Sequence, residues 1–442
     1  MIERQPASLE AEGSPDTQVD TLNLFDAIVV GAGAAGLMAA RHLAHAGKDV
    51  CVLEASNRVG GRVMTLYDTS AGTPIELGAE FVHGDAPETT RLLDEARLIT
   101  VPALGKQYRS DRGELSPQGP LWERLSKVFE HLDPDKKKDR SFQDFLDDKP
   151  GGARLKRERQ LACGFVQGFY GADTTMISEK SLAQAGDPTE GAAESRRVVN
   201  GYTPLIDYLK RDVAQSIRLN VVVRRVLRTE DHVRVFDQRG EEYRARAVII
   251  TVPLPMLQDE TIAIEPEIPK LLRAARQLVM GHVTHVKIVV KERFWEKKAK
   301  AISFVHAPER PFNVWWTKYP LLAPVITGWA GGPPALQIAE GGDVESSAIA
   351  ELARAFGMQR RRVESLVESI HRHDWTHDPN FRGAYSYAGI GGSNAPRVLA
   401  GGFDDRIFLA GEATDSGSSG TVEGALATGK RAALKVLKRV RL

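Results

Sequence analysis

The glycine-rich loop Gly31-Ala-Gly-Ala-Ala-Gly36 constrains this chain more than any other segment. It follows a short, apolar, β-branched run, Asp26–Val30, and it opens an Ala- and Leu-rich stretch, Gly33–Ala46, that stops at Gly47. The first run predicts a buried strand and the stretch after it predicts an α-helix. A second apolar run, Lys48–Glu54, predicts the next strand. This strand–turn–helix–strand unit is the beginning of a doubly wound α/β sheet.

The same unit predicts where the phosphate groups of a dinucleotide lie. Glycine lets the backbone turn tightly and approach a pyrophosphate, and the helix N-terminus supplies free N–H groups and a positive potential. Glu54 ends the second strand, where a carboxylate accepts hydrogen bonds from an adenosine ribose. The residues expected at the cofactor here are Gly31, Gly33, Ala34, Ala35, Gly36, Glu54 and Ala55.

A second basic turn, Arg58-Val-Gly-Gly-Arg62, comes directly after the second strand. Its paired glycines again permit close backbone approach, and the guanidinium of Arg62 is suited to binding two phosphate oxygens at once. A simple nicotinamide-binding fold does not require this turn. The addition therefore favours FAD as the cofactor.

The C-terminal part of the chain repeats this phosphate-binding pattern. The strand-like segment Phe408-Leu-Ala-Gly-Glu-Ala-Thr414 precedes Gly420-Thr-Val-Glu-Gly-Ala425, which opens the last predicted helix. Glu412, preceded by Gly411, is placed to bind a chain of hydroxyl groups. The amides of Thr421 and Val422 direct a helix dipole towards the negative charge that a reduced flavin carries. We therefore expect both ends of the chain to hold one FAD.

The composition argues against several other classes of protein. With 59 basic and 58 acidic residues the net charge is +1, so no overall field attracts nucleic acid or an anionic membrane. No run of about 18 apolar residues predicts a membrane span. Cys51 and Cys163 form no CxxC pair, and no cysteine cluster indicates a metal site. We expect a cytoplasmic protein without metal, nucleic-acid or membrane partners; nothing in the sequence selects an oligomeric state.

The length of 442 residues exceeds one ordinary hydrophobic core, so we expect two domains. From Pro87 onwards, helical stretches such as Leu121–Leu132 alternate with charged loops. Aromatic strand candidates follow within Phe304–Trp329, and Ala348–Ser369 is predicted to be helical. Residues 1–23 are polar and acidic, which predicts a disordered tail. The predicted architecture is α/β: a doubly wound, Rossmann-like FAD-binding domain (24–86, 196–284 and 385–442) with an inserted α+β substrate domain (87–195 and 285–384).

Eight segments, taken in order, resemble the flavin-containing amine oxidase family, which includes monoamine oxidases, polyamine oxidases, L-amino-acid oxidases and flavin histone demethylases. The first and the last two are the specific ones. The segments are GAGAAG (31–36), Glu54 with RVGGR (58–62), ELGAEFVHG (76–84), TVPL (251–254), KERFW (291–295), RGAYSY (382–387), FLAGEAT (408–414) and GTVEGA (420–425).

The resemblance implies how the chain holds FAD. Glu54 would bind the adenosine, Arg62 and the amides of residues 31–36 the pyrophosphate, and Glu412 the ribityl or phosphate oxygens. Val223 would offer backbone hydrogen bonds to the adenine. Near the isoalloxazine ring the resemblance implies Gly78 and Ala79, with Trp375 packed on the flavin. The covalent-flavin cysteine of some relatives aligns near Ala384, so we expect noncovalent FAD.

The resemblance also implies a reaction. In such enzymes a neutral amine transfers a hydride from its α-carbon to flavin N5, and the resulting imine is hydrolysed to an aldehyde. Oxygen then reoxidises the flavin and yields hydrogen peroxide, so the expected partners are a small-molecule amine and O2. Because the cofactor performs the difficult step, no catalytic triad is expected.

The resemblance places Tyr385 in an aromatic wall of the substrate cage, opposite Thr421, where monoamine oxidases often carry a tyrosine. Aromatic faces suit an amine because they attract a cation and confine an apolar carbon chain. The family usually has a lysine ten residues before the Trp of its FW pair, and counting back from Trp295 gives His285. Either this imidazole or Lys287, two residues further along the same strand face, would then hold a water near the flavin.

The segment ELGAEFVHG is closer to the polyamine-oxidase relatives than to the amino-acid oxidases, which tend to carry an arginine at the position of Phe81. Glu80 and His83 are candidates for attracting or orienting an amine, and a structural role for His83 is the alternative. Two other functions remain open. One is a flavin desaturase or porphyrinogen-type oxidase, and the other is an FAD-stabilised binding protein with little turnover, which the histidine at position 285 suggests.

Overall fold

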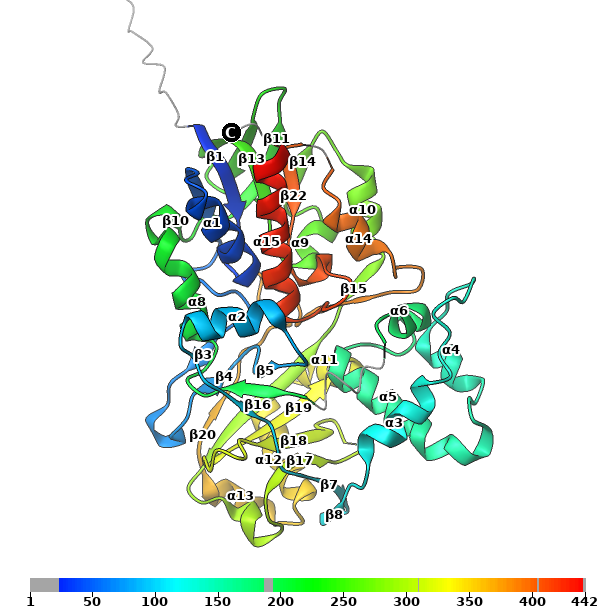
Figure 1. Cartoon of the computed structure of the whole chain (residues 1–442). Helices are drawn as coiled ribbons and strands as arrows, with labels where there is room; N and C mark the ends of the chain where they lie inside the picture. Colours follow the sequence, from blue (N-terminus) through cyan, green and yellow to red (C-terminus); the bar gives the residue numbers. More distant parts are fainter. Residues whose placement is uncertain (1–23, 187–193, 309, 404, 440–442) are drawn as a thin grey trace, which may run out of the picture.

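The computed structural model describes residues 24–186, 194–308, 310–403 and 405–439. The predicted tail, residues 1–23, lies outside the described residues. Two large sheets organise the molecule. Figure 1 shows one in the upper half, beside the first and last helices, and the other in the lower half.

An eight-stranded sheet forms the upper half. Strand β1 lies in its centre and pairs in parallel with β2 on one side and β13 on the other. Strand β22, from near the C-terminus, also pairs in parallel with β13. The strands are β1 (Leu24–Val30), β2 (Val50–Leu53), β10 (Ile217–Arg218), β11 (Val223–Arg228), β12 (Val233–Asp237), β13 (Glu242–Ile250), β14 (Ala263–Glu265) and β22 (Ile407–Leu409).

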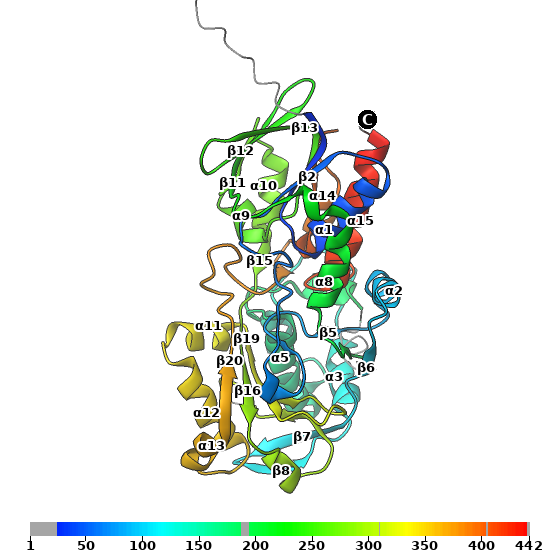
Figure 2. The same ribbon diagram turned by 90° about the vertical axis from the view of Figure 1, so that its left-hand side faces the viewer.

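Helices cover both faces of this sheet, as Figure 2 shows. On β1, Ala27 and Val29 pack into one hydrophobic cluster, whereas Ile28 and Val30 pack into another. This alternation follows from the two-residue period of a strand and requires a core on each face. One core contains α1 (Ala34–His45), α8 (Thr203–Lys210) and α15 (Val422–Arg439), and the other α9 (Leu254–Gln258), α10 (Pro269–Arg276) and α14 (Ala395–Ala400).

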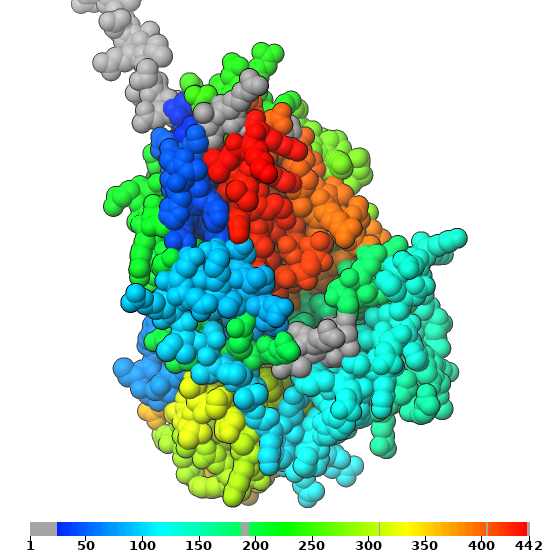
Figure 3. Space-filling model, in the orientation of Figure 1, coloured from blue at the N-terminus to red at the C-terminus, as the bar shows by residue number. Residues whose placement is uncertain are grey.

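Helices α1 and α15 lie side by side on the surface (Figure 3), although they come from opposite ends of the chain. Gly429 permits this approach, because a Cβ at that position would lie 2.2 Å from the Ala35 carbonyl oxygen. The two phosphate-binding segments recognised in the sequence are thereby brought together.

A seven-stranded sheet forms the lower half, in the order β20, β16, β19, β18, β17, β7, β8. One face packs against three helices around a separate hydrophobic cluster. The strands are β7 (Lys106–Asp111), β8 (Glu114–Pro117), β16 (Val283–Val290), β17 (Ile302–His306), β18 (Val314–Thr317), β19 (Val325–Gly331) and β20 (Val367–His371), and the helices are α11 (Pro333–Glu340), α12 (Val344–Ala355) and α13 (Arg360–Leu366).

The remaining elements form a helical layer and three small sheets. The layer comprises α3 (Leu121–Phe129), α4 (Phe142–Asp147), α5 (Lys156–Tyr170) and α6 (Glu179–Gln184). The small sheets pair β3 (Thr65–Leu66) with β4 (Ile75–Glu76), β15 (Leu278–Met280) with β21 (Ser386–Ala388), and β9 (Arg196–Val198) with both β5 (Phe81–Val82) and β6 (Thr100–Pro102).

The prediction of one helical stretch over Ala348–Ser369 is wrong. Helix α12 ends at Ala355, and Gly357 adopts a positive φ of 58° that an α-helix does not contain. Helix α13 then begins at Arg360, and β20 begins at Val367. Periodicity within a short segment did not reveal this change from helix to strand, because β20 forms only by pairing with β16.

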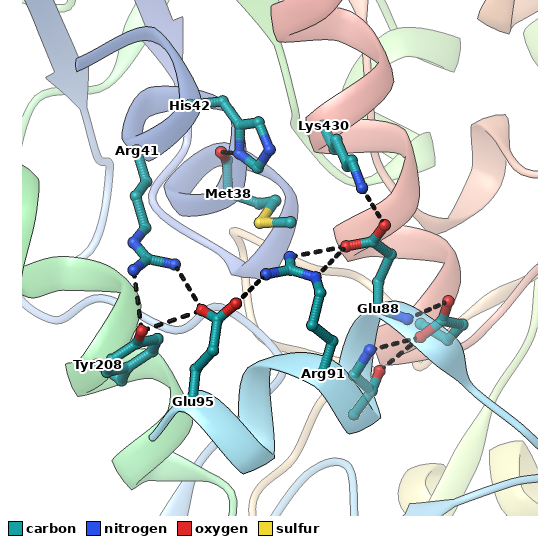
Figure 4. Close-up of polar contacts among 10 residues, drawn as sticks. Met38, Arg41, His42, Glu88, Arg91, Glu95, Tyr208 and Lys430 are labelled. Carbon is teal, nitrogen blue, oxygen red and sulfur yellow. Dashed lines mark hydrogen bonds and ion pairs between the residues drawn. The ribbon is translucent and has the colours of Figure 1, made fainter. Parts of the chain in front are cut away.

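Ion pairs and hydrogen bonds of charged side chains connect helix α2 (Pro87–Glu95) to the upper half of the molecule (Figure 4). Glu88 pairs with Lys430 of α15, and Glu95 accepts a hydrogen bond of 3.0 Å from Tyr208 of α8. Glu423 of α15 accepts hydrogen bonds from the backbone amides of Glu88 and Thr89. This carboxylate supplies the N-terminal cap that the preceding Ala86 lacks.

Candidate active site

A cavity of about 540 Å³ joins the two halves of the molecule. At one end it is lined by the loops that follow the parallel strands of the upper sheet. At the other end it is lined by one face of the seven-stranded sheet and by α3 and α5. All the predicted site residues line this cavity except Gly36 and Lys287.

The N-terminus of α1 opens into the cavity. Gly33 precedes the helix and supplies no side-chain cap, and the first turn contains no acidic residue. The free N–H groups and the positive pole of the helix are therefore available to an anionic group. Gly36 lies behind this surface: a Cβ there would lie 1.9 Å from the Gly31 carbonyl oxygen, so glycine is needed for close packing of helix and strand. The loop fits a pyrophosphate.

Glu54 is held rigidly beside this loop. Its two carboxylate oxygens accept hydrogen bonds from the backbone amides of Ala32, at 2.6 Å, and Ser56, at 2.8 Å. The carboxylate is buried and lines the cavity. The neighbouring Ala55 and, across the sheet, Val223 also line the cavity. A carboxylate has further lone pairs on both oxygens, so this arrangement fits the hydroxyl groups of a ribose.

Arg62 and Glu412, which lie 350 positions apart, form an ion pair of 2.9 Å. Arg62 also donates to the Ala384 carbonyl oxygen. Glu412 is buried and accepts further hydrogen bonds from Ser386 and from the Gly420 amide. The preceding Gly411 has a φ of 132°, a conformation that side chains rarely adopt.

The start of α15 faces the same cavity. The Thr421 hydroxyl accepts a hydrogen bond from the Gly424 amide and so caps the helix. Thr421 and Val422 line the cavity, and among the described residues their own amides have no acceptor. Two helix N-termini, those of α1 and α15, are therefore directed at one cavity, which suits a long molecule with an anionic centre.

A narrow passage lies between these helices and the lower sheet. A Cβ at Gly78 would lie 2.0 Å from the Arg62 carbonyl oxygen and 3.3 Å from the Trp375 ring. Trp375 donates its indole N–H to the Leu77 carbonyl oxygen at 2.6 Å, which fixes the ring beside Gly78 and Ala79. This flat, glycine-lined passage fits a planar ring system.

His285 donates through Nε2 to the same Leu77 carbonyl oxygen, at 3.1 Å. Because a carbonyl oxygen only accepts, Nε2 carries the proton and Nδ1 of the neutral ring is an acceptor. Burial and the neighbouring Lys287 lower the pKa of His285 to about 3. Nδ1 is buried and has no hydrogen-bond partner among the described residues. The imidazole is therefore neutral over the working pH range and retains one free acceptor.

Lys287, the alternative to His285, does not line the cavity. Its ammonium group forms a buried ion pair of 2.6 Å with Glu80. Lys318 and Arg197 contact the same carboxylate at 3.1 and 3.2 Å, and Trp316 donates to it.

The cations around Glu80 determine its ionisation. Burial alone would raise the pKa of Glu80, but Lys287, Lys318 and Arg197 hold that pKa well below its usual range. One carboxylate thus faces three cations. The expectation that Glu80 attracts an amine is not met, because the protein itself neutralises this carboxylate.

Aromatic side chains surround the space beyond the passage. Tyr385 lies against Gly420 and donates its hydroxyl to the Phe169 carbonyl oxygen at 2.9 Å. The His83 ring lies 5.3 Å from that of Phe169, and its Nδ1 is 2.9 Å from the Ser195 hydroxyl. Further aromatic residues line the cavity that the sequence did not single out, because neither helix nor strand periodicity says which face borders a cavity. They are Trp122, Phe165, Phe169, Tyr170, Phe304, Trp316, Trp329 and Phe381.

Neither cysteine lines the cavity, which agrees with noncovalent flavin. Burial raises the pKa of Cys51 to about 11.

Within the described residues there is no group of three or more histidine, cysteine or acidic side chains that could hold a metal ion. Nor does that part of the chain contain a helix with the length and hydropathy needed to cross a bilayer.

Comparison with known proteins gives consistent matches. Residues 34–437 match the model of the flavin containing amine oxidoreductase family. The chain is 29% identical to polyamine oxidase 3 of Oryza sativa subsp. japonica, over 94% of this chain and 90% of that protein. It is 26% identical to lysine-specific histone demethylase 2 of Homo sapiens, over 92% of this chain and 53% of that protein.

Among solved structures, the chain is similar to wild-type putrescine oxidase bound to putrescine. The TM-score is 0.81 at 21% identity, over 94% of this chain and all of that chain. At this identity the likeness concerns the fold. It confirms the predicted fold class, a doubly wound α/β unit with an additional α+β part.

Proposed function

The chain belongs to the flavin-containing amine oxidoreductase family and its cofactor is FAD, and on this basis we propose that it is an FAD-dependent amine oxidase. The observation that carries the proposal is the continuous cavity that joins two helix N-termini to an aromatic compartment. Its relatives named polyamine oxidase and its structural neighbour putrescine oxidase support a small-molecule amine as the substrate.

The residues described above divide the binding of FAD between them. We assign the pyrophosphate to the amides at the start of α1 and to Arg62, and the adenosine to Glu54, Ala55 and Val223. Glu412, with Gly411, holds the ribityl chain. Gly78, Ala79 and Trp375 would border the isoalloxazine, and the amides of Thr421 and Val422 would stabilise negative charge on it.

The two proposed domains follow the same division. Residues 24–86, 196–284 and 385–442 carry most of the groups assigned to FAD, and residues 87–195 and 285–384 carry most of the aromatic compartment. Both cysteines are free thiols, which supports the intracellular setting expected from the sequence.

FAD, when bound, would supply the acceptor for a hydride from the α-carbon of a neutral amine. Tyr385 attracts the substrate cation on entry and, with Thr421 opposite, confines its carbon chain. His285, through Nδ1, would hold a water whose addition to the imine releases the aldehyde together with the amine or ammonia. His83 orients the amine at the edge of the aromatic compartment. Oxygen is the proposed electron acceptor and hydrogen peroxide its product.

Anaerobic mixing of the FAD-loaded protein with amines tests this proposal. Aliphatic amines, aromatic amines, polyamines and L-amino acids are each added, and the visible absorbance of the flavin is followed. At least one amine should bleach the flavin, and admission of oxygen should restore the colour with formation of peroxide and aldehyde. A fully loaded protein that no amine bleaches would instead support a binding role. Bleaching by apolar polyenes or porphyrinogens alone would point to the desaturase class.

The variant Tyr385→Ala tests the assignment of the cage. Loss of one aromatic wall should lower amine turnover about tenfold, which corresponds to the contribution of a single aromatic or cation–π contact. The protein should remain yellow, since Tyr385 is not assigned to FAD. An unchanged kcat/KM would remove this residue from the site.

A further inference from the structure

The end of the cavity farthest from the helix N-termini carries a cluster of polar side chains. We call it the distal cluster: Gln107, Arg109, Gln118, His306 and Asn313, all of which line the cavity. Gln107 and Arg109 lie on β7, Gln118 follows β8, His306 ends β17, and Asn313 precedes β18.

A row of directly opposed residues connects the passage to this cluster. Across one face of the sheet, His285 pairs with Trp329, Trp329 with Val314, Val314 with His306, and His306 with Arg109. All five line the cavity. Four strand spacings of about 4.8 Å each separate the ends of the row by roughly 19 Å.

Two side chains of the distal cluster have polar atoms without a partner. Gln118 is only 5% exposed, and neither its Nε2 nor its Oε1 has a hydrogen-bond partner among the described residues. The buried Oδ1 of Asn313 also has none. Buried amides are almost always hydrogen-bonded, so a free donor and free acceptors on two side chains that line the same cavity indicate a ligand group that both accepts and donates.

The charges around the cavity disfavour a second ammonium group. Three lining residues of the described chain carry carboxylates, namely Glu54, Glu80 and Glu412, and each is engaged by backbone amides or by cations. Within the distal cluster, Arg109 is an exposed cation, and burial lowers the pKa of His306 to about 4. A neutral His306, hydrogen-bonded to Gln107 at 3.0 Å, adds polarity and no negative charge.

We propose that the distal cluster is a second substrate subsite, which binds a neutral amide group at the far end of a long amine. The amide carbonyl accepts from Gln118 Nε2, and the amide N–H donates to Gln118 Oε1 or Asn313 Oδ1. The apolar chain between the two ends lies along Trp329, Phe304 and Trp122. This inference rests on the proposed amine oxidase function and narrows its substrate class: an acylated amine is preferred to a polyamine with a free second ammonium group.

A matched series of amines tests the subsite. All members have the same reacting primary amine and are prepared over a range of chain lengths. Their far end is an acetamide, an ammonium, a carboxylate or a methyl group. The rate of anaerobic flavin bleaching gives kcat/KM for each. At the optimal length, the acetamide-ended amine should exceed the ammonium-ended amine at least tenfold, the effect of about one good hydrogen bond plus an unmatched charge.

The variant Gln118→Leu keeps the side-chain size and removes both free polar atoms. It should lower kcat/KM for the acetamide-ended amine about tenfold and leave the methyl-ended amine unchanged. Because unpaired buried polar atoms are replaced by apolar ones, its Tm should not fall. Gln337→Ala, an exposed glutamine of α11, is the control that should alter neither substrate.

The two proposals fail in different ways. If no member of the series bleaches the flavin, the proposed function itself is wrong. If the ammonium-ended or carboxylate-ended amine is the best substrate, or if Gln118→Leu affects the acetamide- and methyl-ended amines equally, the amine oxidase stands and the amide subsite is overturned.

Discussion

At the cofactor end of the cavity the charged side chains are held by partners from the protein itself, whereas at the distal end several polar atoms have none. Glu54 is fixed by two backbone amides, and Arg62 and Glu412 fix each other. Gln118 and Asn313, by contrast, keep buried amide atoms that have no hydrogen-bond partner in the described part of the chain. The cofactor end is thus preorganised for a permanent occupant, and the distal end keeps its hydrogen-bonding capacity for a ligand that comes and goes.

Glu80 lies between these two regions. Like the charged side chains at the cofactor end, it is held by partners from the protein itself. Its carboxylate pairs with Lys287, Lys318 and Arg197 in a buried environment, so it serves the scaffold. Lys287, with its pKa lowered by burial to about 8, is the cation of this group closest to losing its proton.

The largest expected effect is therefore on stability. Glu80→Gln removes the carboxylate that pairs directly with three buried cations, and we expect the free energy of unfolding to fall by about 3–5 kcal/mol at neutral pH. Thermal unfolding monitored by circular dichroism measures it. The matched control is Glu292→Gln, which removes an exposed carboxylate that also pairs with two cations, Lys297 and Arg362, and should leave Tm nearly unchanged. Equal effects of the two substitutions would contradict the role assigned to Glu80.

A smaller effect is expected at the cofactor end. Glu54→Ala and Arg62→Ala each remove charge-assisted hydrogen bonds assigned to FAD, and each should weaken FAD binding by about 1.5–3 kcal/mol, or roughly tenfold to a hundredfold. The ratio of flavin to protein absorbance after gel filtration reports the loss. Gln118→Leu, at the distal end, should retain its FAD. If both cofactor-end variants kept full FAD, the assignment of the phosphate end would be wrong.

The smallest effect concerns pH. The folded pKa of His285 is about 3, well below the ordinary value of 6.5, so between these values the unfolded chain binds more protons at this site. Stability from this group is complete above pH 6.5 and is lost as pH falls towards 3. One pH unit below 6.5 the loss is about 1 kcal/mol. The variant His285→Gln lacks this loss of stability, so the acid limb of its Tm–pH curve should be flatter than that of the wild type. His131→Gln, an exposed histidine, should not. Parallel acid limbs for wild type and His285→Gln would mean that the imidazole is not held neutral by burial.

Some parts of the site were predictable because they depend on local sequence. The GAGAAG loop has its form because glycines permit the tight turn and a strand and a helix flank it. Glu54 follows from its place at the end of the second strand. Other parts depended on pairing between distant strands. Whether His285 or Lys287 lines the cavity is such a case. The two residues are two positions apart on β16 and therefore share one face of the strand, so the strand period does not distinguish them.

The amino-acid sequence by itself determined the α/β class, the two phosphate-binding segments and the identity of the cofactor. These features reside in short runs whose glycines, strands and helix starts act over a few residues. Only the tertiary structure decided that Arg62 meets Glu412, that the Glu80 carboxylate pairs with three cations, and that the buried side-chain amide of Gln118 has no hydrogen-bond partner among the described residues. The physical reason is that ion pairing and desolvation depend on which distant side chains come into contact, and local periodicity carries no record of those contacts.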